Sequence, residues 1–188
     1  ILYADGVEYF QTAGQEVQKL IDSVQLRQDS IYMWCDSASI TNQVQMVAMG
    51  NVVIRQGDSL TIFSDSLNYD GEEKLAYLFG DVVLERGDQQ LRTERLDYDL
   101  NTKIATYQEG AVLTNGATQL TSKRGYYHTA TDEVFFKDSV IVIDAEFDLR
   151  TDTLKLNTVS EVVTFLSPTL IRSDSVNIYC EDAVSYTH

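Results

Sequence analysis

An internal repeat of about 29 residues constrains the fold of this chain more than any other feature. Residues 50–79 and 80–109 show the repeat most plainly, because each opens with a glycine, a polar residue and two valines. A unit of such an array buries its apolar face against its neighbours, so consecutive units are expected to stack. Four residues recur 29 positions further along the chain: Leu67 as Leu96, Tyr69 as Tyr98, Lys74 as Lys103 and Ala76 as Ala105.

Weaker copies extend the repeat in both directions. Asp-Ser-Val at residues 22–24 occupies the position of Gly-Asn-Val at 50–52, and Asp-Ser-Val at 138–140 opens a later copy. About six units fill the chain and leave no segment for a second fold, so we expect a single domain over residues 1–188. The copies have the approximate bounds 1–21, 22–49, 50–79, 80–109, 110–137, 138–167 and 168–188.

Each unit has the alternation of apolar and polar residues that is typical of half-buried β-strands, as at Val82 and Leu84. The connections are too short for parallel crossovers, so neighbouring strands should be antiparallel. The apolar residues change parity near Thr93 and Glu94, which predicts a bulge or corner. We therefore expect an all-β fold of about a dozen strands. Only Gln15–Ile21 is compatible with a short helical turn.

The charge of the chain excludes several classes of partner. Its 29 acidic and 14 basic residues give a net charge of −15, which opposes nucleic acid and opposes an anionic membrane held by charge. No run of eighteen apolar residues occurs, so we expect no transmembrane helix. Because the chain begins at Ile1 and not at Met, we expect that an N-terminal signal segment has been removed.

No catalytic or metal-binding signature is present, so we expect neither an enzyme nor a cofactor. His128 stands at a turn position, and the other histidine is the terminal His188. The dipeptide Asp-Ser recurs seven times at related positions, which indicates that these acids serve turns or corners. We expect Trp34 to pack in the core or at an edge. Cys35 and Cys180 lie too far apart in a linear array to form a disulfide.

The repeat also resembles a known family. The segments MWCDSASI at 33–40, GNVVIRQGDSLTIFSDSLNYDGEEKLAYLFGDVVL at 50–84 and DTLKLNTVSEVVTFLSPTLIRSDSVNIY at 152–179 carry the resemblance. They resemble the OstA-like family, which includes LptA, LptC and the N-terminal domain of LptD, and most closely its Bacteroidetes members. The resemblance implies an antiparallel β-jellyroll, V-shaped and open at its ends. Pro168 and the lack of glycines after residue 138 predict an irregular C-terminal end.

The same resemblance implies a periplasmic lipopolysaccharide-transport component. It would shelter lipid A acyl chains in an apolar groove and assemble end to end, with itself or with other Lpt-type jellyrolls, to bridge the two membranes. The alternatives are a structural scaffold or adhesin module without lipid, and a carbohydrate-active β-helix enzyme with converging carboxylates.

The alternation predicts which residues face the groove. In the third strand of each unit two choices remain open, since either Ala76 and Leu78 or Leu75 and Tyr77 could point inward. The candidates elsewhere are Val52, Ile54, Leu60, Ile62, Leu67, Tyr69, Val82, Leu84, Leu91, Leu96, Tyr98, Val112, Leu120, Tyr127, Phe136, Val140 and Val142.

Overall fold

The computed structural model describes residues 3–28, 30–57, 60–173, 176–181 and 183–186. Every regular element within these ranges is a β-strand, and the strand pairs are antiparallel, which confirms the predicted fold class. The chain forms two compact units. The first comprises Ile1–Gly87 and Glu94–Asn101, and the second comprises Asp88–Thr93 and Thr102–His188. The single domain expected over residues 1–188 stays a prediction.

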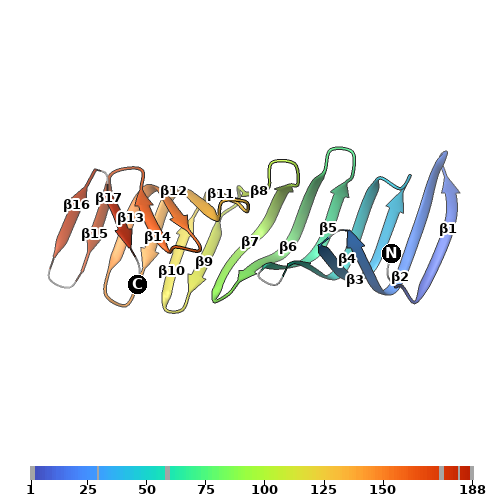
Figure 1. Cartoon of the computed structure of the whole chain (residues 1–188), viewed down its shortest axis with the longest axis horizontal. Coiled ribbons are helices and arrows are strands. Elements are labelled where there is room, and N and C mark those ends of the chain that lie inside the picture. The colour runs from blue at the N-terminus through green and yellow to red at the C-terminus, as the bar shows by residue number, and fades with distance from the viewer. Residues whose placement is uncertain (1–2, 29, 58–59, 174–175, 182, 187–188) are drawn as a thin grey trace. The chain divides into compact units, whose positions relative to one another are not determined.

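The first unit is a succession of long strands in which each pairs with the next through a short turn, as Figure 1 shows. Gln15–Ile21 belongs to a strand, so the helical turn considered for it does not form; Val17 and Leu20 are buried there by the pairing of the strand on both sides. The strands are β1 (Gly6–Thr12), β2 (Gln15–Gln28), β3 (Ile31–Thr41), β4 (Gln45–Gln56), β5 (Leu60–Asp70), β6 (Leu75–Arg86) and the second part of β7 (Gln89–Asp99).

The second unit has shorter strands that pair in two series. One series runs through β7, β9, β10, β12, β13, β15 and β16, and the other through β8, β11, β12, β13, β14 and β17. The long strands β12 and β13 belong to both series. The bounds are β8 (Ile104–Tyr107), β9 (Ala111–Asn115), β10 (Thr118–Ser122), β11 (Arg124–His128), β12 (Glu133–Ile143), β13 (Asp148–Asn157), β14 (Val162–Phe165), β15 (Thr169–Arg172), β16 (Asn177–Cys180) and β17 (Ala183–Tyr186).

The described residues therefore contain seventeen strands, more than the dozen expected. The difference arises at the corners. In the first unit a strand such as β6 passes through its corner unbroken, whereas in the second unit the corner divides strands into the pairs β8 and β9, β10 and β11, β14 and β15, and β16 and β17.

The corners are β-bulges built from consecutive residues with positive φ. In β2, β4 and β12 two such residues lie opposite one residue of the next strand, and the register shifts there. The expected change of parity is also present, because Thr93 and Leu96 are both buried. The positive-φ pairs are Asp22–Ser23, Gly50–Asn51, Gly80–Asp81 and Asp138–Ser139.

Four of the recurring Asp-Ser dipeptides, at residues 22–23, 36–37, 65–66 and 138–139, lie at these corners. A Cβ atom at Gly50 would overlap Oδ2 of Asp36, and one at Gly80 would overlap Oδ2 of Asp65. Asn51 completes the first corner by donating from Nδ2 to Asp36 Oδ2 at 2.9 Å. These carboxylates thus pack on glycine corners of the next strand. The Asp-Ser copies at residues 29–30, 58–59 and 174–175 lie wholly or partly outside the described residues.

Polar side chains close the turns between strands at another position that recurs every 29 residues. Asp70 Oδ1 accepts hydrogen bonds from the backbone of Glu72 and Glu73, and Asn157 Oδ1 does the same for Val159 and Ser160 at 3.1 and 2.9 Å. Such Asx turns explain the Asp and Asn residues at this position.

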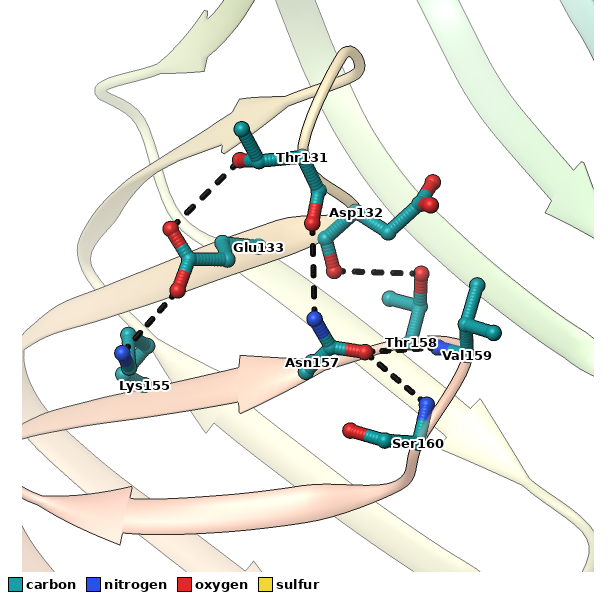
Figure 2. A network of polar contacts seen from close by, with 8 residues as sticks. All are labelled: Thr131, Asp132, Glu133, Lys155, Asn157, Thr158, Val159 and Ser160. Atoms are coloured by element: carbon teal, nitrogen blue, oxygen red, sulfur yellow. Dashed lines mark hydrogen bonds and ion pairs between the residues drawn. The ribbon is translucent and has the colours of Figure 1, made fainter.

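Neighbouring turns are also joined to one another, as Figure 2 shows. The Thr158 backbone N–H donates to the Asp132 carbonyl at 2.8 Å, and Asn157 Nδ2 donates to the Thr131 carbonyl at 3.4 Å. Lys155 Nζ donates to Glu133 Oε1 at 2.9 Å on the adjoining strands. Hydrogen bonds therefore join these neighbouring turns as well as the strands.

Candidate functional site

The interior of the first unit contains a row of buried apolar side chains, one from each of five consecutive strands. The register aligns these residues directly across β2 to β6, and each is at most 3% exposed. The row therefore crosses the unit as a continuous apolar strip. Its members are Leu20, Ala38, Ala48, Leu67 and Leu78.

A second row lies on the other side of the corner in the same unit. Leu26 and Ile54 are half-buried, and the rest are buried. Between the corner and this row, Val24, Val52 and Val82 are each 1% exposed. The second row consists of Leu26, Met33, Ile54, Ile62 and Leu84.

The second unit repeats this arrangement, with aromatic side chains in one of its two rows. One aligned row contains Leu91, Leu113, Leu120, Val142, Leu149 and Ile171. On the other side of the corner a row contains Tyr107, Gly125, Phe136, Leu154 and Phe165. Three aromatic rings thus stand where the first unit has aliphatic residues, and Phe136 is fully buried.

Small polar side chains line the corner at intervals of 29 residues. Thr93 Oγ1 donates to the Gly110 carbonyl at 2.7 Å, and Ser64 Oγ donates to the Ser66 carbonyl at 3.2 Å. Hydrogen bonds of this kind satisfy backbone groups that the bulge removes from the strand ladder. This corner series consists of Cys35, Ser64, Thr93, Ser122, Thr151 and Cys180. Sequence reasoning missed the series, although its spacing was visible.

Tyr107 brings a hydroxyl group into the apolar interior of the second unit. Its hydroxyl oxygen lies 2.5 Å from Ser122 Oγ, and Ser122 Oγ donates to the Arg124 carbonyl at 3.2 Å. Burial raises the pKa of Tyr107 to about 12, although the hydrogen bond between Tyr107 and Ser122 opposes the shift. A Cβ atom at Gly125 would overlap this hydroxyl, so the glycine makes room for the ring.

The two cysteines are free and belong to the corner series. Cys35 is buried, and burial together with the neighbouring Asp36 carboxylate raises the pKa of its thiol to about 11. A buried thiol with a raised pKa is an unreactive core group. Cys180 is half-buried, and its Sγ donates to the Thr169 carbonyl at 3.8 Å.

Most residues predicted to face the groove are buried: Val52, Ile62, Leu67, Val82, Leu84, Leu91, Leu96, Leu120, Tyr127, Phe136, Val140 and Val142. Ile54, Leu60, Tyr69, Tyr98 and Val112 are half-buried. In the third strand Ala76 and Leu78 are buried, while Leu75 and Tyr77 are half-buried. Of the two pairs left open by the sequence, Ala76 and Leu78 are therefore the pair that points inward. That any of these residues contacts lipid stays a prediction.

Val112 differs from the other candidates, because its two neighbours Ala111 and Leu113 are the buried residues of β9. The expected inward position followed from aligning Gly110 with Gly80, which are 30 residues apart. The buried residues keep a spacing of 29, so Ala111 corresponds to Val82 and Leu113 corresponds to Leu84. Val112 therefore lies on the opposite face of the strand.

The remaining polar candidates do not converge on a site. His128 is half-buried, and its ring makes an edge contact with Tyr126 at 5.4 Å between centroids. His188 lies outside the described residues. In the part of the chain that the structure describes, no three His, Cys, Asp or Glu side chains are grouped so that they could bind a metal. Within the same ranges, no helix has the length and apolar character needed to cross a membrane.

These features define a β-repeat protein with aligned apolar rows in its interior. A family model described as "OstA-like protein" matches residues 1–152, and the chain belongs to this family. A search of curated protein sequences gives no match.

Among solved structures, the chain is similar to LptH, described as the LptA homologous periplasmic component of the conserved lipopolysaccharide transport device from Pseudomonas aeruginosa. The two chains share 18% sequence identity with a TM-score of 0.49, over 64% of this chain and 93% of LptH.

Proposed function

We propose that this protein is a periplasmic component of lipopolysaccharide transport that shelters lipid acyl chains between its apolar rows. Membership of the OstA-like family supports the proposal. The observation that carries it is the unbroken row from Leu20 to Leu78, which extends the same apolar surface across five strands. A surface continuous across strands suits a cargo that moves along the array.

Acyl chains are the part of such a lipid that the interior can bind. Each methylene group removed from water contributes about 0.8 kcal/mol, so several chains outweigh any single polar contact. The net charge of −15 opposes the anionic head group of lipopolysaccharide. Recognition is therefore expected to rest on the acyl chains, with the head group left in solvent.

The proposal includes end-to-end assembly with a second copy or with another jellyroll of the transport system. β1 pairs with β2 through seven residue pairs, and its Val7, Tyr9 and Phe10 are 43, 76 and 45% exposed. In β16, Ile178 and Tyr179 are 50 and 66% exposed. Apolar side chains beside terminal strands suit β-strand addition, and this head-to-tail contact can continue into a filament.

Photocrosslinking tests the proposal directly. A benzophenone amino acid at Tyr69 or Tyr98 should capture lipopolysaccharide in the native envelope. The control positions are Asn68, which neighbours Tyr69 on the same strand but is exposed on the opposite face, and Glu85. Lipid adducts that form only at Asn68 or Glu85, or at none of the four positions, would contradict lipid transport through the interior.

One observation favours a second function, that of a structural scaffold without lipid. The row from Leu20 to Leu78 is at most 3% exposed, and Phe136, Leu154 and Phe165 of the second unit are at most 5% exposed, as in an ordinary filled core. Mass spectrometry of lipid that co-purifies from the native envelope separates the two functions. Lipopolysaccharide in stoichiometric amount supports transport, whereas its absence together with unchanged envelope lipid in a deletion strain supports the scaffold.

A further inference from the structure

The outer face of the first unit carries a stack of aromatic rings and arginines. The guanidinium carbon of Arg27 lies 5.0 Å from the centroid of the Tyr32 ring, and that of Arg55 lies 5.8 Å from the Trp34 ring. The two rings are themselves stacked, with centroids 6.1 Å apart and an interplanar angle of 15°. The register places Arg27, Tyr32 and Arg55 directly beside one another on β2, β3 and β4.

An apolar row adjoins this stack. Trp34 pairs with Val53, Val53 with Phe63, and Phe63 with Val83, so one side chain from each of β3 to β6 lies in line. These residues alternate with the buried Met33, Ile62 and Leu84 and therefore point away from the interior. Phe63 is 37% exposed, and the others are half-buried. We call the stack and this row together the outer patch.

The repeat shows that the fold does not require an aromatic residue in the stack. The residues in phase with Tyr32 in the following units are Thr61, Gln90, Gln119 and Asp148, which are all polar. Phe63 occupies the position of Trp34 in the next unit, and Arg92, Thr121 and Arg150 occupy it further along the chain. All of these positions lie in strands. The aromatic rings of the first unit are thus an addition to the common framework.

We infer that the outer patch is a docking surface for a protein segment in which acidic residues flank apolar ones. Trp, Tyr and Arg are the residues that dominate binding energy at protein interfaces, and here they adjoin an apolar row. Stacking on the rings orders the arginine side chains in advance, which lowers the entropic cost of binding.

Charge complementarity selects the acidic partner. The chain has a net charge of −15, so most of its surface repels an anionic segment, whereas the patch presents two arginines. Arg55 pairs with Thr61, and Thr61 pairs with Glu85, which is the acidic residue in this line of paired residues. An anionic membrane is less suitable, because two arginines are fewer than the four to eight basic residues that such binding takes.

Fluorescence anisotropy of labelled peptides tests this inference. The probes are a short peptide in which glutamates alternate with leucine and phenylalanine, its lysine counterpart, and a glutamate-only peptide. The acidic apolar peptide should bind at least about tenfold more tightly than either of the others. Trp34 is the sole tryptophan of the chain, so its emission should change on binding and report the site.

Matched variants locate the binding. R27Q/R55Q and F63S should each weaken binding of the acidic apolar peptide about tenfold, whereas R92Q/R150Q should leave it unchanged. Thermal unfolding of every variant excludes loss of the fold as the cause. Any of three results would overturn the inference. The three peptides could bind equally, or R27Q/R55Q could leave binding unchanged. Phosphatidylglycerol vesicles could also bind in preference to the acidic apolar peptide, in a manner that depends on Arg27 and Arg55. None of these results depends on lipid in the interior.

Discussion

The hydroxyl oxygen of Tyr107 lies 2.5 Å from Oγ of Ser122, and the ring beside it occupies the space that a side chain at Gly125 would need. Tyr107 is 2% exposed and Ser122 is 7% exposed. The interior of the second unit therefore holds a hydrogen-bonded pair of hydroxyl groups beside an apolar row.

Removing Ser122 Oγ should destabilise the protein by leaving the Tyr107 hydroxyl buried without that partner. We expect S122A to lower the free energy of unfolding by about 1–3 kcal/mol in urea titrations. Adding Y107F to S122A should recover part of the loss, because the unsatisfied hydroxyl is removed as well. A double variant no more stable than S122A would contradict coupling between the two hydroxyl groups.

Gly125 should not tolerate a side chain. A Cβ atom there would overlap the Tyr107 hydroxyl and lie 2.6 Å from the Phe135 carbonyl oxygen. We expect G125A to lower the free energy of unfolding by about 1–3 kcal/mol, as for other overpacked cores. G6A is the control, since a Cβ atom at Gly6 would meet Ile21 at an ordinary 3.5 Å. Equal effects of the two substitutions would contradict the proposed packing.

High pH should destabilise the protein through Tyr107 and Cys35. The folded state raises the pKa of Tyr107 from 10.0 to about 12 and that of Cys35 from 9.0 to about 11. The folded state holds both groups in their neutral forms. Their contributions to the free energy of unfolding are therefore complete below the unfolded-state pKa values and decline as pH rises through the folded-state pKa values. Unfolding titrations should show loss of stability that begins near pH 9 and continues to about pH 12.

Y107F and C35S provide the controls for this pH dependence. Y107F should reduce the loss between pH 10 and 12, and C35S should reduce the loss between pH 9 and 11. If both variants follow the wild-type profile, other groups cause the alkaline destabilisation.

Cys35 should be replaceable by serine at neutral pH. Ser64 and Ser122 occupy the corresponding corners one and three units later, so the corner accommodates a hydroxyl in place of the thiol. We expect C35S to change the free energy of unfolding by less than about 1 kcal/mol, and the bulky C35F to lower it by about 1–3 kcal/mol. A large loss in C35S would mean that the thiol has a role outside the corner series.

The corner between Asp36 and Gly50 should show similar coupling. Gly50 has a φ of 77°, and a Cβ atom there would overlap the Asp36 carboxylate. We expect G50A to lower the free energy of unfolding by about 1–3 kcal/mol, with part of the loss recovered in D36A/G50A. G14A, which also has positive φ but no atom within 4 Å of its Cβ position, isolates the cost of the backbone conformation.

The sequence predicted much of the strand pattern, because alternation and repeat spacing depend on local order along the chain. Leu67, Leu96 and Val82 could be placed on the buried face for this reason. Val112 could not be placed correctly, because the spacing of the repeat changes by one residue at Gly110 and the alignment of the glycines concealed this change. A shift of one residue exchanges the two faces of a strand. The number of strands also escaped prediction, because it depends on whether each corner interrupts the hydrogen-bond ladder.

The sequence by itself determined the 29-residue period and the antiparallel β class, and it indicated that the Asp-Ser dipeptides serve turns or corners, since each follows from spacing and short connections. Tertiary structure decided which residues of different units become neighbours. Contacts between different strands include the pairing of Tyr107 with Ser122, the close approach of Asp36 to Gly50, and the stack of Arg27, Tyr32, Trp34 and Arg55. Such contacts depend on register and on bulges, which only the folded chain fixes.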